Sequence, residues 1–323
     1  MRSKIRVGVL RGGPSREHDI SIKTGAYILK NLPDNYAPVD IFIDKSGVWH
    51  VQGVAEPLDK ALKKVDVIFN AAHGQYGEDG ALQRLLDTFG MPYTGSGHLA
   101  SLFAMHKGHS KKFLKSHGIK SPFHKLLKKD DASRQNLHEL WRSIPNPSVI
   151  KPIALGSSLG VSVVKNFLEL QSALEKAFAV SPTIIIEEHI TGREATCAVI
   201  DSFRGEKTYA FLPVELILPT GSNFFDYDAK YGGKTKTIHP GRFSAMEKYE
   251  IQNMARKVHE ALGLRHYSRS DFIVSPTRGV YFLETNTLPY LASDSPFIGS
   301  LSAVGLSFSG FLEHVLRLAL EGK

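Results

Sequence analysis

The sequence predicts an α/β protein whose N-terminal part is built on a parallel sheet and whose remainder mixes antiparallel strands with helices in an α+β arrangement. Short apolar runs alternate with helical patterns over the first hundred residues, which is typical of a parallel sheet with helices on its faces. Two β runs around a Pro/Gly turn near residue 277 predict an antiparallel hairpin in the last third. A chain of 323 residues has room for two or three domains.

The first domain is expected over residues 1–97 and ends at the small-residue loop Gly95-Ser96-Gly97. A Gly-rich turn at 12–15 follows the first strand, and Gly90 ends the second helix. The expected strands cover 5–10, 39–43 and 65–70, and the expected helices cover 20–32 and 81–89.

A central domain is expected over 98–187 and a C-terminal domain over 188–323. The central segment has Lys- and Leu-rich helices and strands at 148–152, 160–165 and 183–186, the first two around a Gly/Ser loop. The C-terminal segment contains a long polar loop at 221–242 and a helix that begins with the capping box Ser244-x-x-Glu247 and ends at Gly263. A final helix has Phe308, Phe311, Leu312, Val315 and Leu316 on one face.

Composition and charge exclude several classes of protein. The formal net charge is +8, but the basic residues are dispersed, which disfavours a nucleic-acid partner and suits a polyanionic small molecule. No apolar run reaches the roughly 18 residues of a membrane span, and the run at 5–10 is too short for a signal peptide. Cys197 is the only cysteine, so no internal disulfide is possible. We therefore expect a cytoplasmic protein with neither a membrane nor a nucleic-acid partner.

The hairpin around residue 277 brings polar residues together on one face. A symmetric turn between Thr277 and Arg278 places Asp271 opposite Glu284 and Arg269 opposite Asn286. Because side chains alternate faces along a strand, all four project from the same side. The same register puts Phe272, Val274, Tyr281 and Leu283 on the other face, as the expected core.

Two directly opposed carboxylates repel each other unless a cation lies between them. Asp271, Glu284 and Asn286 supply hard oxygen ligands, the set that Mg²⁺ prefers when it also binds phosphate oxygens. Arg269 beside them is suited to stabilise a developing oxyanion or phosphoryl group. The alternative is a solvated face with an Arg–Asp salt bridge.

Three loops follow strands and offer further ligand groups. Lys151-Pro152 runs into the Gly/Ser loop 156–160, whose small residues let backbone N–H groups approach phosphate oxygens, although a plain turn explains the loop as well. The apolar strand ending in Glu187 and Glu188 has carboxylates suited to an adenine and a ribose, or it simply passes into a surface turn. His73 follows a strand of the first domain, where α/β sheets present ligand loops, or is merely a loop histidine.

Taken together these motifs resemble the D-alanine–D-alanine ligase family of the ATP-grasp superfamily over nearly the whole chain. The matching motifs are Gly12-Gly13-x-Ser15-x-Glu17-His18, His73-Gly74-x-x-Gly77-Glu78-Asp79-Gly80, Pro92-Tyr93-x-Gly95-Ser96-Gly97, Lys151-Pro152 with Gly156-Ser157-Ser158-x-Gly160, Asp226-Tyr227-x-Ala229-Lys230-Tyr231, and Arg269-x-Asp271 with Glu284-x-Asn286-Thr287. The resemblance implies an ATP-grasp fold behind the N-terminal α/β domain.

The resemblance also implies a reaction and its residues. One D-alanine carboxylate is phosphorylated by ATP to an acyl phosphate, which the amino group of a second D-alanine then attacks. The residues that the resemblance implies for ATP binding are Lys107, Lys151, Ser157, Ser158, Glu187, Glu188, Glu194 and Lys230. The residues that it implies for substrate binding and catalysis are Glu17, His73, Ser157, Tyr231, Arg269, Tyr290 and Ser295. Two Mg²⁺ ions, for which Mn²⁺ can substitute, fall to Asp271, Glu284 and Asn286.

The chain departs from the family pattern at the acceptor end. Tyr290 stands where relatives have a glycine, and the Ser-Leu pair that holds the acceptor carboxylate reads Ser295-Pro296, where proline has no N–H. The expected function is D-alanyl-D-alanine synthesis for peptidoglycan by a homodimer. The alternatives are a relative that joins a different pair and an ATP-binding protein without turnover.

Overall fold

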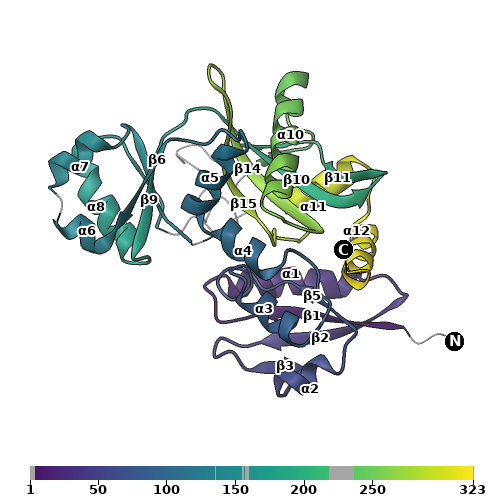
Figure 1. Cartoon of the computed structure of the whole chain (residues 1–323). Helices are drawn as coiled ribbons and strands as arrows, with labels where there is room; N and C mark the ends of the chain where they lie inside the picture. The colour runs from purple at the N-terminus through teal and green to yellow at the C-terminus, as the bar shows by residue number, and fades with distance from the viewer. Residues whose placement is uncertain (1–3, 135, 155, 157–159, 218–235, 323) are drawn as a thin grey trace.

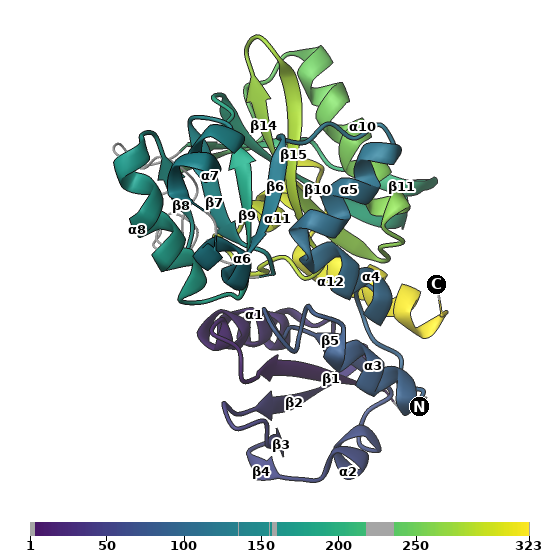
Figure 2. The same cartoon turned by 60° about the vertical axis from the view of Figure 1, so that its left-hand side comes forward.

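The chain folds around three β-sheets, each covered by helices (Figure 1). The computed structural model describes residues 4–134, 136–154, 156, 160–217 and 236–322. The N-terminal sheet lies below the other two, and the central and C-terminal sheets lie side by side above it (Figures 1 and 2).

The N-terminal sheet has the strand order β4-β3-β2-β1-β5. Strands β1, β2 and β5 are parallel, which confirms the predicted parallel sheet, and β3 and β4 extend one edge as an antiparallel pair. Its elements are β1 (Ile5–Gly12), α1 (His18–Asn31), β2 (Tyr36–Ile43), β3 (Trp49–Val51), β4 (Val54–Ala55), α2 (Leu58–Leu62), β5 (Val67–Asn70) and α3 (Ala81–Thr88).

The central sheet is antiparallel, in the order β6-β9-β7-β8. Its apolar residues form their own core with the helices on one face, from Leu127 to Ile186. The elements are β6 (His124–Lys128), α6 (Lys129–Arg134), α7 (Leu137–Ser143), β7 (Ser148–Pro152), β8 (Ser162–Val164), α8 (Phe167–Phe178) and β9 (Thr183–Glu188).

The C-terminal sheet runs β13-β12-β10-β14-β15, with β11 paired to β10. Helix α10 covers it and begins with the predicted capping box of Ser244 and Glu247. The elements are β10 (Arg193–Phe203), β11 (Glu206–Ala210), β12 (Val214–Ile217), β13 (Lys236–Ile238), α10 (Ala245–Ala261), β14 (Tyr267–Ser275), β15 (Gly279–Asn286), α11 (Pro296–Ala303) and α12 (Phe308–Leu320).

Helices α4 (His98–Met105) and α5 (Lys107–Ser116) link the N-terminal sheet to the rest. The division expected from the sequence assigns them to the central domain. In the structure Ala104 and Leu114 instead pack in the core of the C-terminal sheet, together with Phe272 and Phe282. The central sheet and its helices therefore form a smaller unit than the segment 98–187.

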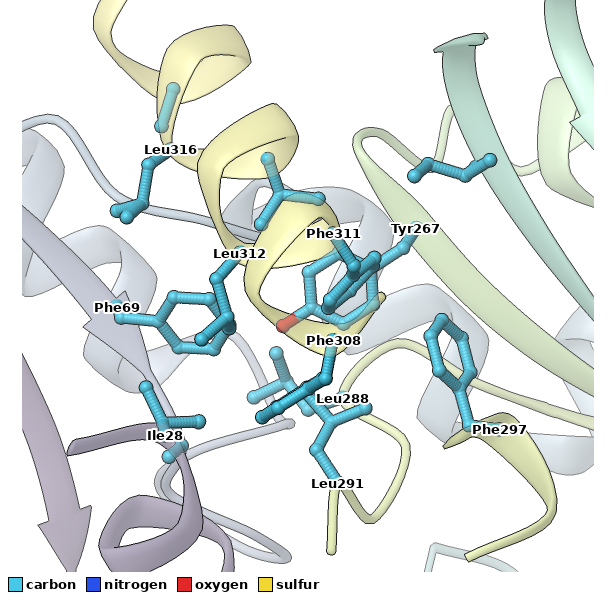
Figure 3. Packing of buried hydrophobic residues seen from close by; sticks show 14 of the residues in the cluster. Ile28, Phe69, Tyr267, Leu288, Leu291, Phe297, Phe308, Phe311, Leu312 and Leu316 are labelled. Carbon is cyan, nitrogen blue, oxygen red and sulfur yellow. The ribbon is translucent and has the colours of Figure 1, made fainter. Parts of the chain in front are cut away.

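A large apolar core joins the two ends of the chain (Figure 3). Helix α12 carries the predicted apolar face into this core, where Phe311 contacts the rings of Tyr267 and Phe297 at centroid distances of 5.3 and 5.2 Å. Phe69 of β5 stacks on Tyr267 of β14 at 6.5 Å. Because buried aromatic contacts resist displacement, this core fixes the loops of the N-terminal sheet relative to β14 and β15.

Within the described residues, no single helix is long and apolar enough to cross a membrane. The pair α11 and α12 passes such a test only when taken together, and it is bent by 98°.

Candidate active site

A cavity of about 590 Å³ lies between the central and C-terminal sheets. Strands β7 and β9 line one side and β10, β12, β14 and β15 line the other, so the two antiparallel sheets close on it from both sides. The predicted site residues in its lining are Lys107, Lys151, Glu187, Glu188, Glu194, Asp271 and Glu284. Residues spread over more than half of the sequence therefore share one cleft.

The β14–β15 hairpin has the predicted register at the site. Asp271 pairs with Glu284, and Arg269 pairs with Asn286. The guanidinium of Arg269 donates to both carboxylate oxygens of Asp271 at 3.1 Å, and the Thr196 hydroxyl donates to the same group at 2.6 Å. An Arg–Asp bridge is therefore present, but Arg269 and Asp271 are each only 8% exposed, so this is not the solvated face of the alternative interpretation.

The prediction for the opposite face of this hairpin was half wrong. A β-bulge between Asp271 and Phe272 leaves Leu283 as an extra residue, so that Phe272 pairs with Phe282. Toward the turn the bulge exchanges the faces of β15, because one added residue shifts the two-residue alternation. Phe282 and Val280 therefore enter the core with Phe272 and Val274, whereas Leu283 lines the cavity and Tyr281 lies outside that core cluster.

The carboxylates of Asp271 and Glu284 have a cation nearby. Lys107, the first residue of α5, lies 3.3 Å from the Glu284 carboxylate. Asn286 donates from its side-chain amide to Asp271 at 3.4 Å. Asp271, Glu284 and Asn286 thus present oxygen atoms beside the cleft, a donor set that fits Mg²⁺.

A buried charge cluster forms the floor of the cleft on the β9 side. The Glu187 carboxylate is 1% exposed and forms ion pairs with Lys111 of α5 and, at 2.8 Å, with Lys151 of β7. Burial alone would raise the pKa of Glu187, but the charges of Lys111 and Lys151 lower it to about 2. Burial opposes the charge on Lys151 as well, yet Glu187 and Glu284 raise its pKa.

Glu188, the last residue of β9, points to the rim of the same cleft. Its carboxylate forms an ion pair with Arg278 at the tip of the β14–β15 hairpin. This pair joins the central sheet to the C-terminal sheet at the edge of the cavity. Glu194 lies across the cavity on β10, where it pairs with Ile273 of β14.

A second polar cluster lies at the N-terminal sheet. Glu17, His73 and Glu78 each place a potential ligand atom within 4.8 Å of the others. Glu17 precedes α1, and the other two lie in the loop after β5. The His73 ring bonds the Thr24 hydroxyl at 2.8 Å, and its backbone carbonyl accepts from Ser15 at 2.7 Å. Parallel-strand connectivity therefore brings two distant loops together at one sheet edge.

Burial controls the protonation of this cluster. It lowers the pKa of His73 to about 4, so the ring is neutral at neutral pH. Burial, followed by the charge of Glu17, raises the pKa of Glu78 to about 8, although the backbone N–H of Gly74 donates to it at 2.9 Å. At neutral pH the cluster therefore contains a protonated Glu78 close to Glu17.

Gly156, which follows β7, lies against this second cluster. A Cβ atom added to Gly156 would lie 2.6 Å from the Glu17 carboxylate, so only glycine fits there without a shift. Gly156 also lines a small cavity with Glu78, Lys107 and Glu284, and the last two of these line the main cleft as well. The predicted Ser157, Ser158, Lys230 and Tyr231 lie outside the described residues.

The predicted acceptor residues lie at the start of α11. Ser295 is the N-cap, its hydroxyl accepts from the Ile298 N–H at 3.2 Å, and Pro296 occupies the first turn. Proline suits this position because its missing N–H would have no helical partner. Burial, with the charge and hydrogen bond of Asp294, raises the pKa of Tyr290 to about 12.

Two residues of the site were absent from the predicted set. For Glu78 the available signal was its position five residues after His73, in a loop that follows a strand. Lys111 lies one turn after Lys107, and residues four apart on a helix share a face, so the spacing pointed to it.

Known families match nearly the whole chain. Residues 113–317 match the family model described as D-ala D-ala ligase C-terminus, and residues 6–61 and 54–96 match the D-ala D-ala ligase N-terminus model. A D-alanine–D-alanine ligase of Pelotomaculum thermopropionicum is 34% identical over 98% of this chain and 97% of its own length. One of Carboxydothermus hydrogenoformans is 35% identical over 99% of each.

Solved structures of similar proteins have the same architecture. The VanG D-Ala:D-Ser ligase from Enterococcus faecalis matches with a TM-score of 0.84 and 29% identity, over 98% of this chain and 100% of its own. The D-alanine–D-alanine ligase from Bacillus anthracis, complexed with ATP, matches with a TM-score of 0.81 and 30% identity over 98% of each chain.

Proposed function

Because this chain belongs to the D-alanine–D-alanine ligase family, with its ATP-grasp fold, we propose that it uses ATP to join two D-alanines through an acyl phosphate. One observation is the main support for this proposal. Gly156 lies beside Glu17 and lines a small cavity with Lys107 and Glu284, which also line the main cleft. A nucleotide in the cleft and an amino acid at the cluster would then meet beside Gly156.

The cleft is suited to ATP. Lys107 and Lys151 supply cations for the phosphates, and Glu188 and Glu194 lie along the rim and far wall for the adenosine. The Glu187 carboxylate is held by two lysines, which suits a role behind Lys151 better than direct contact with the ribose. Ser158 and Lys230 complete this assignment from the family pattern.

Asp271, Glu284 and Asn286 are assigned to two Mg²⁺ ions, with Mn²⁺ as a substitute. Such ions neutralise the charge that develops on transferring phosphoryl oxygens. Arg269 is held in place by Asp271 and faces the same region, so its guanidinium is available to stabilise the transition state.

Glu17 is assigned to the ammonium group of the first D-alanine, with Ser157 and Tyr231 linked to it. Glu17 lies in a buried cluster with His73 and Glu78, and burial strengthens a charge-assisted hydrogen bond from an ammonium group to its carboxylate. The neutral His73 ring shapes the pocket without adding a positive charge that would repel the ammonium.

Ser295 and Tyr290 are assigned to the second amino acid, the acceptor. The cap bond uses the Ser295 oxygen as an acceptor and leaves its O–H for a carboxylate. Pro296 offers no N–H, and the Tyr290 hydroxyl is engaged by Asp294, so we expect weaker acceptor than donor binding.

We further propose a cytoplasmic homodimer that serves peptidoglycan precursor synthesis. Leu99, Leu102 and Phe113 are 68%, 55% and 37% exposed and line an apolar hollow over α4 and α5. Clustered exposed apolar side chains favour a protein–protein contact, here a second copy of the chain. Sedimentation at several concentrations tests this state.

A phosphate-release assay tests the function. We expect release that requires ATP, Mg²⁺ and D-alanine together, with D-alanyl-D-alanine as the product. Release that requires D-serine or a hydroxy acid as the second substrate would assign a different acceptor. Absence of release with every amino acid pair would contradict the ligase assignment.

A further inference from the structure

Lys111 is buried to 1% exposure in the middle of α5, and the proposed function gives it no role. Lysine is almost never buried so completely unless it is paired, because removal of its charge from water costs several kcal/mol. Its position next to the nucleotide cleft therefore calls for an explanation beyond packing.

Lys111 and Lys107 lie one turn apart on α5 and project toward the cleft from the same side. Lys107 contacts Glu284 on β15, whereas Lys111 contacts Glu187 on β9. Helix α5 thus delivers one cation to each of the two sheets that enclose the cavity.

The charges at Glu187 do not balance. Lys111 binds one carboxylate oxygen and Lys151 binds the other, so two cations share one anion. Lys111 is 1% exposed, but the side chain of Lys151 is 16% exposed and lines the cavity. The excess positive charge of the trio therefore reaches the cleft through Lys151.

We propose that Lys111 is a positioning residue for ATP binding, which holds Glu187 so that the ammonium of Lys151 stays available to the nucleotide phosphates. This inference rests on the proposed function. Without Lys111, Glu187 would be left with Lys151 alone, and the two would form a neutral, buried pair drawn away from the phosphates. The reason is the high free-energy cost of a buried, unpaired carboxylate, which favours a closer ion pair between Glu187 and the one cation that remains.

The protonation of Lys111 agrees with this role. Burial lowers its pKa to about 8, and Glu187 opposes the shift. The group is therefore still a cation at neutral pH, as the pairing with Glu187 requires.

Removal of the cation tests the inference directly. Lys111→Met keeps the length of the side chain and removes its charge. We expect the dissociation constant of a non-hydrolysable ATP analogue with Mg²⁺ to rise roughly ten- to hundredfold. The KM for ATP should rise to the same extent, with kcat little changed. Lys112→Met, an exposed neighbour on the same helix, is the matched control and should bind the analogue like the wild type.

A second variant distinguishes positioning from mere support of the fold. Lys111→Met combined with Glu187→Gln removes the cation and the anion together and leaves Lys151 with its charge. We expect the analogue to bind within about threefold of the wild type, because the net charge of the cluster is restored. A purely structural role for Lys111 would make the double variant bind no better than Lys111→Met.

The outcomes are distinct. Wild-type affinity in a folded Lys111→Met protein, or tenfold weaker binding in the double variant, would overturn the inference. If Lys111→Met does not fold, as judged by thermal unfolding, the double variant carries the test by the same criterion. Failure of the wild type to bind the analogue at all would instead contradict the proposed function.

Discussion

Two pairs of acidic residues are built in opposite ways in this protein. Asp271 and Glu284 face each other on one hairpin and have cationic neighbours, Arg269 and Lys107. Glu17 and Glu78 come from separate loops, and there burial and mutual repulsion outweigh the charge of Arg269, which raises the pKa of Glu78 to about 8. The same chemical group thus has cations beside it in one place and a like charge beside it in the other.

The difference shows that the surroundings of a carboxylate decide its task. A guanidinium or ammonium group alongside offsets the repulsion between two opposed carboxylates, so both can lie on one hairpin. Burial beside a like charge favours the protonated form. Five substitutions would break or sharpen this contrast, and the largest effect is expected at Asp271 and Glu284.

Asp271→Asn or Glu284→Gln should lower ATP-dependent phosphate release at least a hundredfold, because a neutral amide keeps the size and removes the charge that binds the metal. The measurement is steady-state release at saturating ATP and Mg²⁺, with circular dichroism to verify folding. Glu206→Gln, on the exposed β11 strand, controls for loss of a negative charge. Normal turnover in both variants would refute the metal assignment.

Glu17→Gln should raise the KM for donor D-alanine roughly ten- to a hundredfold, since a charge-assisted hydrogen bond to the ammonium is lost. The affinity for an ATP analogue should change little, because Glu17 belongs to the other cluster. A donor KM equal to that of the wild type would show that the two acidic pairs do not divide the substrates in this way.

Gly156→Ala should raise the donor KM by a smaller factor, about fivefold or more. The new methyl group would lie 2.6 Å from the Glu17 carboxylate, so the end of that side chain must move from the position in which we expect it to bind the ammonium. Gly97→Ala is the control, since the nearest atom to its added Cβ is 4.0 Å away. An unchanged donor KM would mean that the loop does not press on Glu17 when substrate is bound.

Glu78→Gln should have the smallest effect on the substrate KM values, and its effect should be seen instead in the pH dependence of stability. Its pKa is raised from 4.5 to about 8 in the folded protein, so the folded state binds this proton more tightly than the unfolded state. The resulting stability is present at low pH and is lost as pH rises from about 5 to about 8.

Glutamine imitates the protonated form, so the variant should lose less stability over this pH range. Urea unfolding of both proteins between pH 5 and pH 8 measures the difference. Glu139→Gln, at an exposed position, should keep the wild-type pH profile. Parallel profiles for Glu78→Gln and the wild type would contradict the protonation of Glu78.

The parallel N-terminal sheet, the β7 strand and the capping box of α10 all follow from periodicity and local turn chemistry, and the structure confirms them. The Asp271–Glu284 pairing was predictable because a short turn sets the register of its hairpin. The bulge at Leu283 was not, because it depends on which side chains the core accepts, and so the face of Tyr281 was predicted wrongly.

By itself the sequence indicated the family and a set of candidate site residues such as Asp271 and Glu284, since motif spacing and residue type are local properties. Only the tertiary structure decided which of these residues contact one another. Glu17 lies against Gly156, and Lys111 shares Glu187 with Lys151, across separations that no local pattern encodes. The protonation of Glu78 likewise depends on burial and on a neighbour far away in the chain, because desolvation exists only once the core has formed.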